Sequence, residues 1–209
     1  MHKRKKEKSQ ARILIKPKKG EKYFHYYPQL VVVIGVRLNN KVNFMPCVWN
    51  TGLSYDPFLY GVSVGTERHT NKMLRLAKSF SINFLGYEHK KLIRAMGRSS
   101  GNDFDKAIKF KIDYHDAVEV DAPVISSSYL SMECKKSESK LIGDHILYIG
   151  EVKIMHLLEK LVENPILNIN VVNPTLYLGV DHYITTDNKK LISMKDLPFH
   201  YTSKMNKKR

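Results

Sequence analysis

The sequence predicts a mainly β protein with antiparallel strands and a few peripheral helices. Short segments rich in β-branched and aromatic residues recur along its 209 residues, separated by turn residues. Two or three short helical patterns are inserted between them, but they do not alternate regularly with the strands as in a doubly wound parallel sheet. The turn pair Asn39-Asn40 tolerates positive φ and favours a hairpin. The length fits one domain with extensions.

The first strand is expected at residues 29–38, a buried run of β-branched side chains. Asn39-Asn40 then turns the chain into a second strand at residues 42–45. Pro46 has no N–H to donate, so it is expected to end this strand or distort its ladder. The following residues, 46–57, are expected to form a long loop.

The next strand is expected at residues 59–64, where apolar and polar side chains alternate. A helix is expected to begin at Thr70, which is a suitable N-cap. A second helix is expected at residues 88–96, and a third begins at Asp103 after a loop. Further strands are predicted at residues 80–85, 127–135, 145–155 and 176–180, and polar residues 136–143 are expected to form a hairpin connection.

The net charge of +15 lies almost entirely in the two ends of the chain. Residues 1–22 carry a net +8, residues 189–209 carry +6, and residues 23–188 carry only +1. We therefore predict a basic N-terminal extension (1–22), a domain (23–188) and a basic C-terminal tail (189–209). Basic tails can bind phosphate backbones. No aromatic residue is interleaved with the cluster at residues 3–8, so we interpret the tails as solvated ends and do not expect nucleic-acid binding.

Targeting and common catalytic signatures are not found. The longest apolar run, residues 30–36, is far short of the roughly 20 residues that span a bilayer, and no signal-peptide pattern follows the N-terminal charges. Two separated cysteines, Cys47 and Cys134, fit a reduced, cytoplasmic protein. There is no dinucleotide-binding or phosphate-loop motif, no zinc-site spacing and no serine nucleophile elbow. Without a metal site, an enzyme of this sequence would need a bound cofactor to carry its chemistry.

Several short motifs occur in a suggestive order along residues 28–152. They are Asn43-Phe-Met-Pro46, Ser54-Tyr-Asp-Pro57, Arg68-His-Thr70, Asn83 at the end of a strand, Gly143-Asp-His145 and Gly150-Glu-Val152. In this order the chain resembles the flavin reductase-like family of FMN-binding split barrels, and Tyr177-Leu-Gly179 is similar to the final strand of that family. The resemblance implies an antiparallel split β-barrel that binds FMN.

The resemblance also implies a function. It implies an NAD(P)H-dependent flavin reductase that passes hydride to FMN and electrons onward to an acceptor protein or an oxygenase, with a homodimer as the assembly. NADH and NADPH both remain open as donors, because no nucleotide motif distinguishes them. The alternatives are a non-catalytic flavoredoxin-like electron carrier and, from another class, a nucleic-acid-binding protein that uses its basic tails.

Candidate site residues follow from the same motifs. The flavin ring is expected against the predicted loop, formed by Met45, Pro46, Cys47, Val48, Trp49, Asn50 and Thr51. The FMN phosphate needs charge-assisted donors near a helix N-terminus, for which the candidates are Arg68, Thr70, Asn83, Arg98 and Ser99. His145 is the candidate catalytic residue beside the nicotinamide or the flavin edge. Cys47 lacks a resolving partner nearby, so we interpret it as a small apolar residue, not as a redox thiol.

Overall fold

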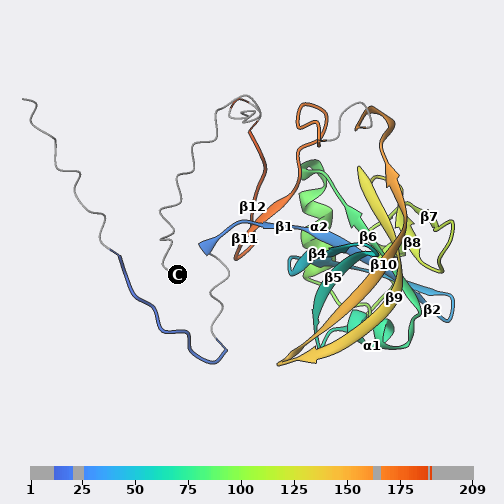
Figure 1. Ribbon diagram of the computed structural model, residues 1–209, viewed down its shortest axis with the longest axis horizontal. Helices are drawn as coiled ribbons and strands as arrows, with labels where there is room; N and C mark the ends of the chain where they lie inside the picture. Colours follow the sequence, from blue (N-terminus) through green and yellow to red (C-terminus); the bar gives the residue numbers. More distant parts are fainter. Residues whose placement is uncertain (1–11, 21–25, 162–165, 188, 190–209) are drawn as a thin grey trace, which may run out of the picture.

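Seven antiparallel strands form the main sheet of the protein, in the order β3-β2-β6-β9-β10-β5-β4 (Figure 1). The computed structural model describes residues 12–20, 26–161, 166–187 and 189. The strands of this sheet are β2 (Val32–Leu38), β3 (Lys41–Cys47), β4 (Asn50–Tyr55), β5 (Phe58–Gly65), β6 (Ser79–Phe84), β9 (Leu130–Ile142) and β10 (His145–Leu157). The fold is a mainly β split barrel, as predicted.

The sheet curls so that the end of β3 meets β5. The Cys47 thiol lies 3.6 Å from the carbonyl oxygen of Ser63, and the Ser63 amide donates to the Trp49 carbonyl at 2.9 Å. Only residues 48 and 49 separate β3 from β4, which returns along β5 as the other edge of the sheet. The turn at residues 47–49 is therefore fixed by the closure of the barrel.

Two smaller sheets accompany the main one. β1 (Gln29–Leu30), β11 (Leu176–Gly179) and β12 (His182–Ile184) pair beside it, and β7 (Tyr114–Asp116) pairs with β8 (Pro123–Ile125). The predicted strand at residues 29–38 is thus divided between two sheets. The break lies at Val31, whose amide donates to the Thr175 carbonyl.

α-Helices and short 3₁₀ turns lie around the strands in the described part of the chain. They are α1 (His69–Leu76), η2 (Tyr87–His89), α2 (Lys90–Gly97), α3 (Lys106–Lys109) and η3 (Glu159–Leu161). α1 covers the barrel interior with Met73 and Leu74. α2 packs Ile93 and Met96 against the other face of β2 and β3.

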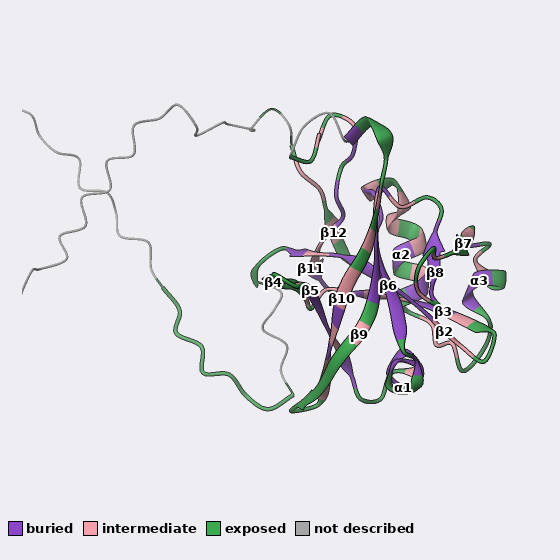
Figure 2. Cartoon of the chain, turned by 45° about the vertical axis from the view of Figure 1, so that its right-hand side comes forward, coloured by how far each residue is buried: buried purple, intermediate pink, exposed green. Residues whose placement is uncertain are grey.

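β2 is buried on both faces, which explains its continuous apolar sequence. Val32, Ile34 and Val36 enter the core inside the barrel, whereas Val31 and Val33 join a second core under α2 and α3. The alternation follows the period of two of a β-strand. Figure 2 shows that β6 is likewise buried along its whole length. β9 is buried near its start and exposed toward the hairpin with β10.

Several local predictions need correction. Pro46 does not end the second strand: it pairs with Val33 inside β3. β3 is an edge of the sheet, where a residue without an N–H leaves no ladder bond broken. The predicted loop at residues 46–57 is also wrong for most of its length, since β4 occupies residues 50–55 and forms a hairpin with β5.

Two helices and one hairpin begin or turn at other residues than predicted. The N-cap of α1 is Arg68, not Thr70, which is buried inside the first turn. α3 is capped by Asp105, whose carboxylate accepts from the Ile108 amide, so it begins after residue 103. Residues 136–142 extend β9, and the hairpin connection is only Gly143 and Asp144. In contrast, the Asn39-Asn40 turn is confirmed, with φ of 49° and 62°.

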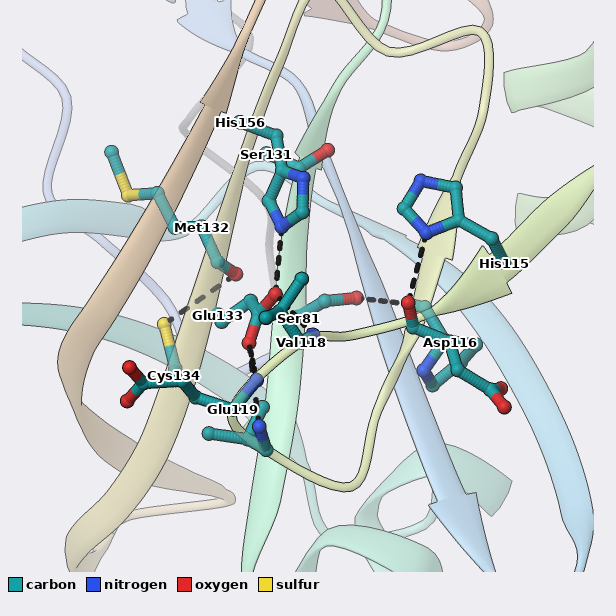
Figure 3. Close-up of polar contacts among 12 residues, drawn as sticks. Ser81, His115, Asp116, Val118, Glu119, Ser131, Met132, Glu133, Cys134 and His156 are labelled. Atoms are coloured by element: carbon teal, nitrogen blue, oxygen red, sulfur yellow. Dashed lines mark hydrogen bonds and ion pairs between the residues drawn. The ribbon is translucent and has the colours of Figure 1, made fainter.

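A buried carboxylate holds the segment between β7 and β8 against the sheet (Figure 3). Glu133 on β9 is 0% exposed and accepts from the backbone amides of Val118 and Glu119 at 2.7 and 2.8 Å. His156 on β10 approaches the same carboxylate with Nε2 at 2.7 Å. Burial alone would raise the pKa of Glu133, but the amides and the histidine outweigh it and hold the pKa below its usual value.

The basic extensions predicted at residues 1–22 and 189–209 lie for most of their length outside the described residues. Within the described part of the chain, no helix has the length and apolar composition needed to cross a bilayer.

Candidate functional site

A cavity of about 1010 Å³, called here the large cavity, opens between the barrel and the β11–β12 hairpin. Residues 45–49 at the end of β3 line one side of it, and residues 63–65 at the end of β5 adjoin them. α2 contributes Ile93, Arg94 and Gly97, and the hairpin contributes Tyr177 and Tyr183. The cavity thus combines apolar and aromatic walls with charged groups, as is typical of cofactor sites.

Trp49 and His145 form the aromatic part of the large cavity. Their ring centroids are 4.5 Å apart with an angle of 43° between the planes. The Nδ1 of His145 lies 2.6 Å from the Asp144 carboxylate, and this hydrogen bond lowers the pKa of Asp144. Because a carboxylate can only accept, Nδ1 carries the hydrogen of this bond. The other ring nitrogen, Nε2, is then an acceptor in the neutral ring and a donor in the imidazolium form.

A second space of about 230 Å³, the small cavity, shares Met45, Glu67, Arg68 and Gly97 with the large one. It lies at the start of α1, where the amides of Asn71 and Lys72 donate to the Arg68 carbonyl and those of His69 and Thr70 precede the helical ladder. His69, Thr70, Ser99 and Ser100 also line it. Free N–H groups, hydroxyls and an arginine at a helix N-terminus are suited to an anion.

Lys106 on α3 adds a buried cation to the small cavity. It is 3% exposed, and its Nζ donates to the carbonyl oxygens of Met96 at 2.8 Å and Phe44 at 3.2 Å. Burial, together with the nearby charge of Arg68, lowers the pKa of Lys106 to about 8. An ammonium has three donors, so the third remains for a further acceptor.

Two buried polar atoms beside the small cavity have no hydrogen-bond partner in the described part of the chain. They are Nδ1 of His69 and Oδ1 of Asn43. The amide nitrogen of Asn43 donates to the Thr70 hydroxyl at 2.8 Å, which fixes Thr70 beside the cavity. A side chain at Gly101 would collide with both Asn43 and His69, so the loop approaches closely only because this residue is glycine.

The structure brings most of the predicted site residues together. Residues 45–49, Arg68, Arg98 and His145 line the large cavity, and Thr70 and Ser99 line the small one. Arg98 lines the large cavity and not the small one, and its guanidinium is bound to Asp181 at 3.0–3.1 Å.

Three predicted residues lie away from both cavities. Asn50 donates to the carbonyl oxygens of Leu30 and Cys47 from within β4, and Thr51 is exposed further along that strand. Asn83 is fully buried in β6. It donates to the Val33 carbonyl and accepts from the Ile125 amide and the Ser131 hydroxyl. These bonds use its amide within the fold, so we do not assign it to the site.

Cys47 behaves as the sequence suggested. Burial raises the pKa of its thiol to about 12, and the thiol donates to the Trp49 carbonyl. A thiol in this state is inert at neutral pH.

Residues that the sequence reasoning missed are Lys106 and His69 in the small cavity, and Arg94 and Asp181 in the large one. Lys106 follows Asp103-Phe-Asp105, and a lysine in a short polar helix gives no sign that it will be buried. His69 lies inside the recognised Arg68-His-Thr70 motif, so its position could have indicated it.

Comparisons with known proteins agree with this geometry. Residues 24–177 match the family described as the flavin reductase like domain. An FMN-binding protein from Thermus thermophilus, solved with bound p-hydroxybenzaldehyde, has 32% sequence identity and a TM-score of 0.73, covering 88% of this chain and 99% of that one.

Two further relatives extend the comparison. The flavoredoxin of Methanosarcina acetivorans has a TM-score of 0.76 at 22% identity, covering 88% of this chain and 97% of that one, which is a likeness of fold. An uncharacterized protein of Pyrococcus abyssi is 28% identical over 132 residues, which are 63% of this chain and 76% of the relative.

Proposed function

Because the chain belongs to the flavin reductase-like family, we propose that its two joined cavities bind FMN and that it is an NAD(P)H-dependent flavin reductase. The observation that carries the proposal is the pair of cavities itself. A small, cation-lined space at a helix N-terminus adjoins a large space with aromatic and apolar walls. A phosphate-bearing planar ligand requires these two environments side by side.

The residues present fit FMN. The small cavity offers Arg68, Lys106 and the hydroxyl groups of its loop as donors, and the unpartnered Nδ1 of His69 is a buried polar atom that a ligand could satisfy. Met45 and Trp49 would wall the ring. The 32% identical relative is an FMN-binding protein by its own description, which supports the same cofactor here.

When bound, the flavin supplies the redox chemistry, accepting hydride from NADH or NADPH and releasing electrons onward. The residues of the chain bind, orient and exclude water. Asp144 holds the ring of His145 beside Trp49 in the wall of the large cavity, and this leaves His145 Nε2 as the ring nitrogen that would hydrogen-bond to a ligand. No acid–base pair is needed in this role.

The remaining parts of the proposal concern assembly and location. We place the protein in the cytoplasm as a homodimer that delivers electrons to an acceptor protein or an oxygenase, with the basic ends as solvated extensions. Sedimentation velocity in the presence of FMN would measure the oligomeric state directly, and a monomer would contradict that part of the proposal.

The first experiment is the visible spectrum of the purified protein after incubation with FMN and desalting. We expect retained yellow colour that bleaches on anaerobic addition of NADH or NADPH. Retained colour that bleaches only with dithionite would instead support a flavoredoxin-like carrier. A colourless protein would contradict flavin binding altogether.

Substitution of Arg68 is expected to separate FMN from riboflavin. Arg68→Ala removes one charge-assisted donor, so FMN affinity should fall roughly 10- to 100-fold, and riboflavin affinity should change little because riboflavin has no phosphate. Fluorescence quenching titrations measure both. The matched control is Arg75→Ala, which removes an exposed arginine at the other end of α1. Equal losses for the two flavins would count against the assignment of Arg68.

A further inference from the structure

We propose that Arg94, Arg98 and Asp181 form a second anion-binding site in the large cavity, which binds the phosphate groups of the nicotinamide dinucleotide that reduces the flavin. This inference rests on the proposed function and adds the docking site of the donor. It assigns Arg98 to the donor and not to the FMN phosphate.

The three side chains join two elements that are far apart in sequence. Arg94 and Arg98 lie one turn apart at the end of α2, and Asp181 lies in the turn between β11 and β12. Arg94 Nε is 3.0 Å from Oδ2 of Asp181, while Arg98 contacts both carboxylate oxygens, with Nε at 3.1 Å and Nη2 at 3.0 Å. The cluster is therefore a two-arginine clamp that already holds a planar anion.

The clamp has binding capacity left. Each guanidinium has five N–H donors, and Asp181 uses only a few of them. The arginine side chains are 57% and 61% exposed, whereas Asp181 is 24% exposed. Two positive charges face one carboxylate, whose pKa the hydrogen bonds from Arg98 and Arg94 lower, so the cluster remains cationic and open to an incoming phosphate.

The turn that carries Asp181 is strained. Val180 and Asp181 have φ of 48° and 60°, and Gly179 has φ of 100°. A β-branched residue at positive φ is unfavourable, and such strain persists where the surroundings enforce it, often at ligand sites. Val180 lines the large cavity beside Asp181. The family match ends at residue 177, just before this turn.

The number of anion sites identifies the second ligand. FMN carries one phosphate, and the small cavity already provides Arg68 and Lys106 for it. Arg94 and Arg98 line the same large cavity as Trp49 and His145. They would therefore bind the anionic groups of a second ligand that lies beside the flavin. The donor of the proposed reaction carries a pyrophosphate and, in NADPH, a 2′-phosphate, which are the anions that paired arginines bind.

The test is calorimetric titration of the FMN-loaded protein with NADP⁺, which needs no hydride transfer. Arg94→Gln and Arg98→Gln should each weaken NADP⁺ roughly tenfold or more, and FMN affinity should stay within about twofold of the unaltered protein. The matched control is Lys91→Gln, which removes an exposed charge from the same helix and should change neither. Arg94→Lys, which keeps the charge, should retain part of the affinity and shows that the site is intact.

The outcomes discriminate between ligands. A larger loss for NADP⁺ than for NAD⁺ would support binding of the 2′-phosphate, and equal losses would support binding of the pyrophosphate. The inference is overturned if a variant that combines Arg94→Gln with Arg98→Gln binds NADP⁺ normally, or if FMN affinity falls as much as NADP⁺ affinity. A protein that binds NADP⁺ through these arginines but is not reduced by NAD(P)H would contradict the reductase function and leave this site standing.

Discussion

Glu133→Gln is expected to lower the free energy of unfolding by about 3 kcal/mol, because the substitution places an amide where a fully buried carboxylate accepts several donors. One end of the glutamine must turn its NH₂ toward N–H donors of residues 118–120 or of His156. For a chain of this size, the loss corresponds to a decrease of roughly 6–12 °C in Tm. Urea denaturation and thermal melting measure the two quantities.

The destabilisation caused by Glu133→Gln should become smaller at acidic pH. The pKa of Glu133 is lower in the folded protein than in the unfolded chain, so its contribution is fully present above the unfolded pKa and is lost as pH falls through the folded pKa. The difference between the unaltered protein and the variant should therefore stay constant from about pH 7 down to the ordinary glutamate pKa of about 4.3 and shrink only as the pH falls further.

Glu138→Gln is the matched control, since Glu138 is exposed on the same strand. This variant should lie within about 0.5 kcal/mol of the unaltered protein. If Glu133→Gln were equally mild, the anchoring of residues 118–120 by the buried carboxylate would not matter for stability.

Lys106→Met is expected to weaken FMN binding by roughly 10- to 100-fold while leaving riboflavin binding nearly unchanged, since of the two flavins only FMN carries a phosphate that would accept from Nζ. Methionine keeps an unbranched apolar side chain of similar length in the buried position. Fluorescence titration with the two flavins measures the difference. Lys109→Met on the same helix is the control, because Lys109 is exposed and does not line the small cavity.

The same lysine predicts a pH dependence of cofactor affinity. With its pKa lowered to about 8, Lys106 loses its charge as pH rises through that value. FMN affinity should therefore fall roughly tenfold or more between about pH 7 and about pH 10. A parallel measurement with riboflavin over the same pH range corrects for ionisation of the flavin ring, which both ligands share. A pH dependence that persists unchanged in Lys106→Met would assign the titration to another group.

The sequence by itself determined the strand-rich architecture and the Asn39-Asn40 turn, and it singled out the Arg68 segment that lines the small cavity. These features depend on local patterns: β-branched runs, residues that tolerate positive φ, and a polar motif between a strand and a helix. The ordered motifs also placed His145 and residues 45–49 on one cavity, since each lies at the end of a strand that the barrel brings together.

Other features were decided only by the tertiary structure. Pro46 remains in β3 because that strand is an edge, which depends on the order of strands in the sheet. Asn83 was predicted to donate to a ligand, but its side-chain amide is already hydrogen-bonded to Val33 and Ser131 on the neighbouring strands. The buried charges of Lys106 and Glu133, and the meeting of Asp181 with α2, join residues that are distant in sequence. No local pattern encodes such partners, because burial and pairing of a charge depend on which surfaces the whole fold brings into contact.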